Sequence, residues 1–203
     1  MTKIKLCGLS RQCDIEYVNG LMPDYIGFVF APKSRRHISF DTAAVLRDHL
    51  NKDITPVGVF VDEKIENIEY LVKSSIISIV QLHGSEDNEY ISALRSRVSR
   101  PVIQAFRIKA ESDIAKAEGS AADYIMLDSG GGTGETFDHS LICGLKRDFF
   151  LAGGLDSENV YEIISRCKPY AVDASSSLET GGAKDKVKMT AFVNAVRYGG
   201  KEK

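Results

Sequence analysis

Short apolar segments recur about every twenty residues along this chain, and few folds accommodate such a pattern. Each segment is rich in β-branched or aromatic residues and is almost continuously apolar, whereas a strand with one face in water would alternate. Such segments are typical of strands that are covered on both faces, as in a parallel sheet. The eight segments are residues 4–8, 25–30, 56–61, 77–82, 101–106, 124–128, 149–153 and 170–175.

Stretches with the spacing of amphipathic helices lie between these segments, as at Leu46 and Leu50 and again at Ile65, Ile68 and Leu71. The chain therefore alternates strand and helix, and eight such units predict a closed barrel. The expected fold class is α/β, a single (β/α)8 TIM barrel that spans residues 1–203 as one domain. A doubly wound open sheet is the alternative, but such sheets more often have about five or six strands and a glycine-rich fingerprint after the first.

Polar residues before several of the expected helices are candidate N-caps, because their side chains can accept hydrogen bonds from unpaired amides of the first turn. We expect helices to begin directly after these positions. They are Ser10, Asp41, Ser85 and Ser157.

Length and charge limit the partners of such a chain. With 203 residues, 43% of them hydrophobic, it can bury one sizeable core but is short for two independent domains. The 26 basic and 28 acidic residues nearly cancel and form no long basic run, so neither nucleic acid nor membrane is expected as a partner. We expect a small-molecule partner and, since no strongly apolar exposed stripe stands out, a monomer.

The cysteines and the first residues indicate the compartment. Cys7, Cys13, Cys143 and Cys167 show neither the short spacing of a zinc or redox site nor the density of a disulfide framework, so we expect reduced thiols and no metal. Residues 1–10 become polar too soon for a secretory leader, and no apolar run approaches the roughly 18 to 20 residues that span a bilayer. A cytoplasmic location fits these features best.

Polar residues follow nearly every expected strand. In a (β/α)8 barrel the C-terminal ends of the strands meet at one mouth, where reactive groups are placed. The residues expected at this mouth are Cys7, Ser34, Arg35, Arg36, Gln81, His83, Asp128, Gly153, Gly154, Asp173, Ser175, Ser176 and Ser177.

Cys7 and Asp128 are the candidate catalytic pair. A buried cysteine is often only a small hydrophobe, but Cys7 ends a strand and precedes Gly8, which would let a substrate approach the backbone. Asp128 ends an otherwise apolar strand; it could simply cap the next turn, yet burial there would raise its pKa and suit it to donate a proton near neutral pH. A thiol base that faces a carboxyl acid favours isomerisation or tautomerisation over hydrolysis.

Glycines and serines after the last two strands favour an anion site. Gly153 and Gly154 free backbone amides, and Ser175, Ser176 and Ser177 add hydroxyls, where TIM barrels often bind phosphate. The alternative is that both segments are ordinary tight turns.

Two further side chains near the mouth could contact a substrate. Arg36 could grip a carboxylate in bidentate fashion, although a solvated surface arginine is the simpler interpretation and the one we favour for Arg35. His83 either binds substrate or satisfies a backbone carbonyl. Residues 130–134, GGGTG, lack the lysine of a nucleotide-binding P-loop, and a lid that excludes water explains their glycines better.

Together these motifs resemble phosphoribosylanthranilate isomerases in order and spacing over nearly the whole chain. A single motif is a weak signal, but the cysteine motif combined with SRR, QLHG and the aspartate after the sixth strand is specific. The matching segments are KLCGLS at 5–10, GFVFAPKSRR at 27–36, VGVFV at 57–61, QLHG at 81–84, LDSGGGTGETFD at 127–138, LAGGLDSENV at 151–160, VDASSSLE at 172–179 and GAKD at 182–185.

The resemblance implies an enzyme of tryptophan biosynthesis that needs no cofactor. Such an aldose–ketose isomerase, an intramolecular oxidoreductase, converts N-(5′-phosphoribosyl)anthranilate to 1-(o-carboxyphenylamino)-1-deoxyribulose 5-phosphate by an Amadori rearrangement. By position, Asp128 would be the general acid and Cys7 the general base. Substrate contacts would come from Arg36 to the anthranilate carboxylate, from amides around Gly154 and Ser176 to the phosphate, and from Asp173 to a ribose hydroxyl.

The chain departs from the family pattern at two positions. Ser177 stands where the family usually has glycine, and if that position needs a positive φ, serine would cost about 1 kcal/mol there and weaken phosphate binding. His139 stands where tryptophan is often found, which would loosen the packing of the expected lid.

Other interpretations remain open. The histidine-pathway isomerase normally uses aspartates after strands one and five, whereas here strand one ends in Cys7 and the fifth segment carries none. Indole-glycerol-phosphate synthase usually depends on strand lysines and glutamates that are not seen at strands two to six. From a different class, the chain could be a catalytically impaired phosphosugar-binding barrel, with Ser177 as the first sign; the presence of both Cys7 and Asp128 argues against this.

Overall fold

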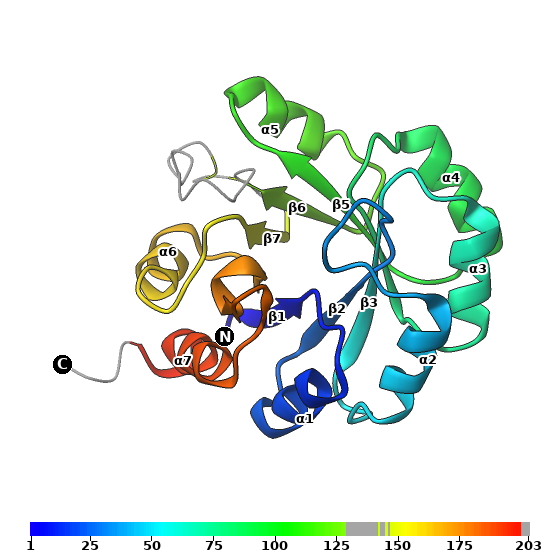
Figure 1. The fold of residues 1–203 in the computed structure, drawn as a ribbon. Coiled ribbons are helices and arrows are strands. Elements are labelled where there is room, and N and C mark those ends of the chain that lie inside the picture. The colour runs from blue at the N-terminus through cyan, green and yellow to red at the C-terminus, as the bar shows by residue number, and fades with distance from the viewer. Residues whose placement is uncertain (129–141, 143–144, 146, 200–203) are drawn as a thin grey trace.

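Eight parallel strands, β1 to β8, close into a barrel in the computed structural model, which describes residues 1–128, 142, 145 and 147–199. Each strand pairs with its neighbours in sequence, and β8 pairs with β1. The helices lie outside the strands (Figure 1). The predicted α/β barrel, with strands covered on both faces, is confirmed.

The barrel strands begin and end within two residues of the segments expected from the sequence. They are β1 (Lys3–Cys7), β2 (Tyr25–Val29), β3 (Thr55–Phe60), β4 (Ile79–Leu82), β5 (Val102–Arg107), β6 (Tyr124–Asp128), β7 (Phe149–Ala152) and β8 (Ala171–Ala174).

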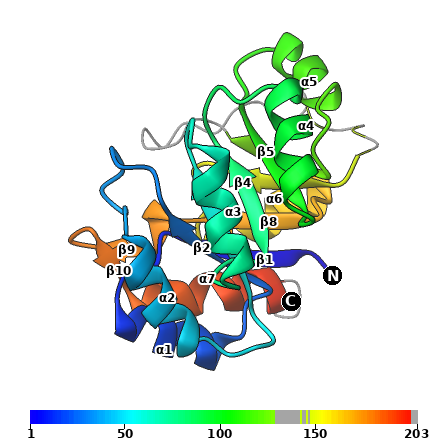
Figure 2. The same ribbon diagram turned by 90° about the vertical axis from the view of Figure 1, so that its right-hand side faces the viewer.

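The helices follow one another round the outside of the strands, from α1 and α2 past α3 to α4 and α5 (Figure 2). Those in the described part of the chain are α1 (Gln12–Leu21), α2 (Phe40–Asp48), α3 (Ile65–Lys73), α4 (Asn88–Arg97), α5 (Glu111–Glu118), α6 (Val160–Cys167) and α7 (Lys186–Tyr198). No helix among the described residues is both long and apolar enough to cross a bilayer.

The main hydrophobic core lies between the strands and the helices. Ile68 and Leu71 of α3 are fully buried, as the helical spacing predicts, and Leu46 of α2 is almost so. Burial of each such side chain contributes about 1.5–3 kcal/mol before its loss of conformational entropy is counted. The apolar face of each helix thus holds it against the barrel wall.

The N-terminal end of the barrel interior is filled by aromatic side chains. The ring centroids of Tyr124 and Tyr170 lie 5.0 Å apart, those of Tyr25 and Phe150 lie 5.6 Å apart, and the hydroxyls of Tyr25 and Tyr170 are 3.0 Å apart. The Lys3 ammonium lies 5.5 Å from the Tyr25 ring centroid and 5.3 Å from that of Tyr170. This aromatic base leaves the opposite end of the barrel for a ligand.

The C-terminal end of the interior carries smaller side chains. Cys7, Val29 and Val59 form a separate cluster there, with Ala31 packed against it. Because these side chains are shorter than the aromatic rings of the base, they leave space inside the mouth.

A short 3-10 helix, η2 (Ser176–Leu178), and an antiparallel hairpin of β9 (Glu179–Thr180) and β10 (Ala183–Lys184) follow β8. Gly181 and Gly182 form the turn with φ of 60° and 83°, a region that favours glycine. Asp185 then caps α7 by accepting hydrogen bonds from the amides of Val187 and Lys188. The hairpin thereby sets Glu179 and Lys184 beside the barrel mouth.

Candidate active site

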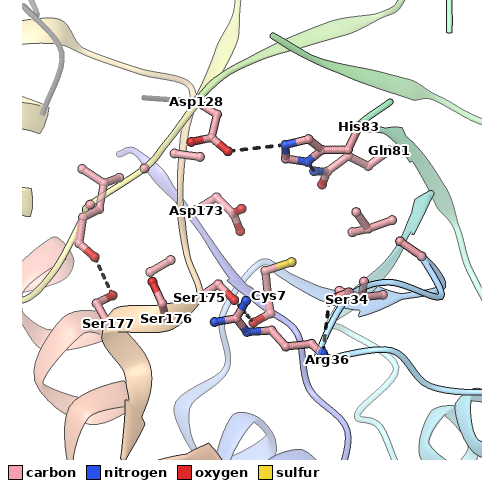
Figure 3. Close-up of a pocket in the computed structure, with 18 of the residues that line it drawn as sticks. Cys7, Ser34, Arg36, Gln81, His83, Asp128, Asp173, Ser175, Ser176 and Ser177 are labelled. Atoms are coloured by element: carbon pink, nitrogen blue, oxygen red, sulfur yellow. Dashed lines mark hydrogen bonds and ion pairs between the residues drawn. The ribbon is translucent and has the colours of Figure 1, made fainter. Parts of the chain in front are cut away.

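A cavity of about 270 Å³ opens at the C-terminal ends of the strands (Figure 3). Val29, Val59 and Ala152 supply part of its apolar wall. Of the thirteen residues expected at the mouth, Arg35 does not line this cavity, whereas the ten to which the sequence assigned a catalytic or binding role all do. They are Cys7, Arg36, His83, Asp128, Gly153, Gly154, Asp173, Ser175, Ser176 and Ser177.

Cys7 is the last residue of β1 and is 7% exposed. Its strand partner is Gly27 of β2, where an added Cβ would lie 2.6 Å from the thiol sulfur. Glycine at this position therefore makes room for the thiol. Burial raises the pKa of the Cys7 thiol, and the nearby Lys5 and Lys184 oppose that rise.

Asp128 ends β6 on another part of the cavity wall, and its side chain is 21% exposed. Its Oδ2 atom lies 3.4 Å from Nε2 of His83, and the Nδ1 atom of that ring lies 3.2 Å from the Gln81 amide nitrogen. His83 thus lies between the carboxyl group and a buried glutamine. Figure 3 shows Asp128 and Cys7 on different sides of the cavity, with Asp173 between them in this view.

Arg36 is held at the mouth by a buried carboxylate. Its Nε and Nη2 atoms donate to the two oxygens of Glu179 at 2.5 and 3.0 Å, a bidentate contact that fixes the plane of the guanidinium. Gly8, with φ of 81°, faces its stem, and an added Cβ there would collide with Cδ of Arg36. Arg36 is therefore no freely solvated surface residue, and one edge of its guanidinium, that of Nη1 and Nη2, faces away from Glu179.

Glu179 also binds two other cations. Arg35 and Lys184 each donate to it at 2.7 Å, and Lys184 donates further to the Ser175 carbonyl at 2.8 Å. Burial alone would raise the pKa of Glu179, but hydrogen bonds from Arg36 and Lys184 leave it below its ordinary value. Three cations on one carboxylate give this side of the mouth a positive charge, which suits an anionic ligand.

Asp173 of β8 lines the cavity and forms an ion pair below it. One of its oxygens accepts from the Lys5 ammonium at 3.0 Å, and Lys5 is fully buried. Burial raises the pKa of the Asp173 carboxyl, while the charge of Lys5 acts in the opposite direction.

The loops after β7 and β8 form the end of the cavity assigned to an anion. Gly153 and Gly154 have φ of 92° and 65°, so both need the conformational freedom of glycine. Within the described residues, the amides of Ser176 and Ser177 donate no hydrogen bond to a protein acceptor. Free amides at this end of a barrel can bind the oxygens of a phosphate group.

The condition for strain at Ser177, a positive φ, is not met, so the expected energetic cost does not arise. Ser177 lies in η2 and is not among the residues with positive φ. Its hydroxyl donates to the Leu155 carbonyl at 2.6 Å, which ties the loop after β8 to the loop after β7. The Ser175 hydroxyl likewise donates to the Cys7 carbonyl at 3.0 Å. These two hydroxyls therefore hold the loop after β8 against the backbone of neighbouring segments.

Several functional positions were missed from the sequence. Lys5 is fully buried between Ile4 and Leu6, and a charge inside this apolar segment was the available signal. Glu179 and Lys184 gave no such signal, because their role arises only when the hairpin brings them to Arg36. The expected lid at 130–134 and His139 lie outside the described residues. Among those that are described, no cluster of histidine, cysteine, aspartate and glutamate is arranged to hold a metal ion.

Comparison with known proteins points to one family. The family model for N-(5′-phosphoribosyl)anthranilate isomerase matches residues 4–195. An N-(5′-phosphoribosyl)anthranilate isomerase of Endomicrobium trichonymphae is 43% identical over 202 residues, which cover 97% of this chain and 99% of the relative.

Solved structures agree. Phosphoribosyl anthranilate isomerase from Thermotoga maritima has a TM-score of 0.90 and 35% identity, with 97% of this chain and 99% of that chain covered. A phosphoribosyl anthranilate isomerase in complex with reduced 1-(o-carboxyphenylamino)-1-deoxyribulose 5-phosphate has a TM-score of 0.88 and 34% identity over the same shares.

Proposed function

The chain belongs to the N-(5′-phosphoribosyl)anthranilate isomerase family, and from this membership we propose that Asp128 is its general acid and Cys7 its general base. The protein is an enzyme of tryptophan biosynthesis, an intramolecular isomerase. Because one relative has been solved with a reduced form of the product, we take the substrate to be the phosphosugar amine N-(5′-phosphoribosyl)anthranilate.

The reaction begins at the ribose ring. Asp128 donates a proton to the ring oxygen as the C1′–O bond breaks, and the nitrogen lone pair forms a protonated Schiff base at C1′. The thiolate of Cys7 then removes the proton from C2′, and the electrons of that C–H bond move to form the enolamine. Loss of the C2′ hydroxyl proton and gain of a proton at C1′ give the ketone. Atoms balance without a cofactor, as an isomerisation requires.

The remaining contacts hold the two anionic ends of the substrate. Arg36 presents its Nη1 and Nη2 edge to the anthranilate carboxylate, since Glu179 occupies the other edge. The amides around Gly154 and Ser176 hold the phosphate, and Asp173 accepts from a ribose hydroxyl. His83 lies beside Asp128, where it can orient the carboxyl group before proton transfer.

One observation carries the proposal. A buried thiol and a carboxyl group line the same small cavity, and the cavity has positively charged side chains at its rim and free amides at one end. That combination serves proton transfer within a doubly anionic substrate.

The test is turnover of phosphoribosylanthranilate, generated in situ from anthranilate and followed by loss of its fluorescence. We expect Cys7→Ser and Asp128→Asn each to lower kcat by about 10²–10⁴-fold, the usual contribution of a positioned acid or base. Cys13→Ser is the matched control, because Cys13 lies in α1 away from the cavity wall.

Circular dichroism and thermal unfolding must show that each variant keeps the fold. Full activity in folded Cys7→Ser or Asp128→Asn would remove that residue from the mechanism. A folded wild type without turnover would favour a catalytically impaired phosphosugar-binding barrel instead.

A further inference from the structure

Lys5 is a lysine inside the barrel. It is 0% exposed, and it does not line the cavity, so it cannot touch a bound substrate. Its ammonium donates to Asp173 at 3.0 Å across the β1–β8 pair, where the two residues are register partners. The side chain is therefore placed by a defined contact.

Lys5 lies one inward position before Cys7 on β1. Residues two apart on a strand point to the same face, so both side chains enter the barrel interior, with Lys5 below the thiol. An ammonium group has three donors, and the contact with Asp173 uses one of them. The other two N–H donors remain for neighbouring acceptors, such as the thiol above the ammonium group.

Stability does not explain this lysine. Burying a charged pair costs desolvation energy that its mutual attraction often fails to repay, and apolar residues of similar volume are frequently as stable or more so. Neighbouring interior positions such as Val57, Ile79 and Ile103 are apolar, which shows how the barrel fills such space elsewhere. A buried lysine under a thiol therefore calls for a chemical reason.

We propose that Lys5 is a positioning residue for catalysis, whose ammonium, oriented by Asp173, stabilises the thiolate of Cys7. The inference rests on the proposed role of Cys7 as the base. It adds a shared counterion, because Lys5 serves both the thiolate and the carboxylate that faces the ribose.

The balance of charges around the thiol supports this role. Burial raises the pKa of Cys7, and Lys5 is the largest influence that lowers it; Asp173 raises it and Lys184 lowers it. For Lys5 itself, burial lowers the pKa, but Asp173 and Cys7 together leave it above its ordinary value, so the ammonium keeps its charge. The other charged or titratable side chains on the cavity wall are Arg36, His83 and Asp128.

The decisive measurement is the pH dependence of Cys7 alkylation by iodoacetamide, followed by peptide mass spectrometry without substrate. Thiolates react and thiols do not, so the rate reports the thiolate fraction. In Lys5→Met we expect the pH at which alkylation is half-maximal, the midpoint, to rise by about one pH unit or more. At pH values below the wild-type midpoint, alkylation of this variant should then be at least about tenfold slower. Lys3→Met is the matched control, since Lys3 points inward from the same strand but lies at the aromatic base; its midpoint should equal that of wild type.

Loss of Lys5 leaves the Asp173 carboxylate buried without its cation, which could unfold the single variant. A second variant therefore removes both charges. Lys5→Met combined with Asp173→Asn replaces the pair by neutral groups, and its midpoint should still exceed that of wild type, because Lys5 acts on the thiol more strongly than Asp173. Asp173→Asn alone should lower the midpoint.

An unchanged midpoint in a folded Lys5 variant would overturn the proposal. Alkylation needs no turnover, so this result is independent of the test of the proposed function. Full activity of Cys7→Ser would show that Cys7 is not the general base, whatever the alkylation midpoint of the thiol. If both hold, the acidic limb of kcat/KM should move with the alkylation midpoint in Lys5→Met and stay in place in Lys3→Met.

Discussion

Glu179 shows how one buried carboxylate can organise several cations. Arg36, Arg35 and Lys184 all donate to it, yet their positions differ, since the Arg35 side chain is 60% exposed and Lys184 is buried. In the substrate complex only Arg36 is expected to contact the ligand. Glu179 therefore acts on binding through the orientation of Arg36.

We expect Glu179→Gln to raise KM about tenfold with little change in kcat, because Arg36 loses a charge-assisted bidentate contact and must be ordered when substrate binds. Steady-state kinetics would measure this. Arg35→Ala is the control, and since an exposed ion pair contributes about 0–1 kcal/mol, its KM should change less than about fivefold. A fall in KM for Glu179→Gln would show that added positive charge outweighs the lost orientation.

At this scale the sequence predicted the residues that stand at strand ends, and it missed those defined by long-range contacts. Cys7 and Asp128 could be found because barrel geometry alone sends strand ends to the mouth. The contact of Arg36 with Glu179 joins residues 143 positions apart, and no local pattern announces it. The φ of Ser177 was likewise left open by the sequence, since it depends on η2, which the sequence pattern did not indicate.

Strands β1 and β2 approach closely where the thiol lies. Gly27→Ala would place a Cβ 2.6 Å from the Cys7 sulfur, so either the thiol or the strand must shift. We expect activity to fall by about 100-fold, as small misplacements of reacting groups do, and the free energy of unfolding to fall by about 1–3 kcal/mol.

Gly20→Ala in α1 is the matched substitution, because an added Cβ there meets nothing within 4 Å. Alanine has a higher helix propensity than glycine, so the free energy of unfolding of this variant should rise by about 0.5–1 kcal/mol. Its activity should not change. Urea unfolding and turnover assays would check both. Normal activity in Gly27→Ala would mean that the thiol tolerates displacement.

The elements themselves were easier to predict than their first residues. The strands are apolar because both of their faces are buried. The N-caps differ from the predicted ones by one or two positions and are Arg11 for α1, Ser39 for α2, Asp87 for α4 and Asn159 for α6. In α1 the Asp14 carboxylate accepts from the amides of Ser10 and Arg11, so a residue inside the helix satisfies the N-terminus in place of Ser10. Several polar side chains near each start compete for the same amides, and local sequence does not decide among them.

For the molecule as a whole, we expect a monomer. The large apolar side chains exposed among the described residues are scattered over several elements, as with Val45 in α2, Tyr70 in α3, Tyr161 in α6 and Tyr198 in α7. Scattered exposure of this kind is normal on monomer surfaces. Size-exclusion chromatography with light scattering should give a mass near 22.3 kDa; twice that mass at micromolar concentration would contradict the expectation.

The barrel interior separates two kinds of residue along the same strands. On β1, Lys3 belongs to the aromatic base, Lys5 to the buried ion pair and Cys7 to the mouth. Substitutions at the base should change the free energy of unfolding, and substitutions at the mouth should change the substrate specificity. Evolution could therefore reach new substrates through a few mouth residues while the base keeps the protein folded. Lys5 lies between the two regions, and its contact with Asp173 connects it to the cavity wall.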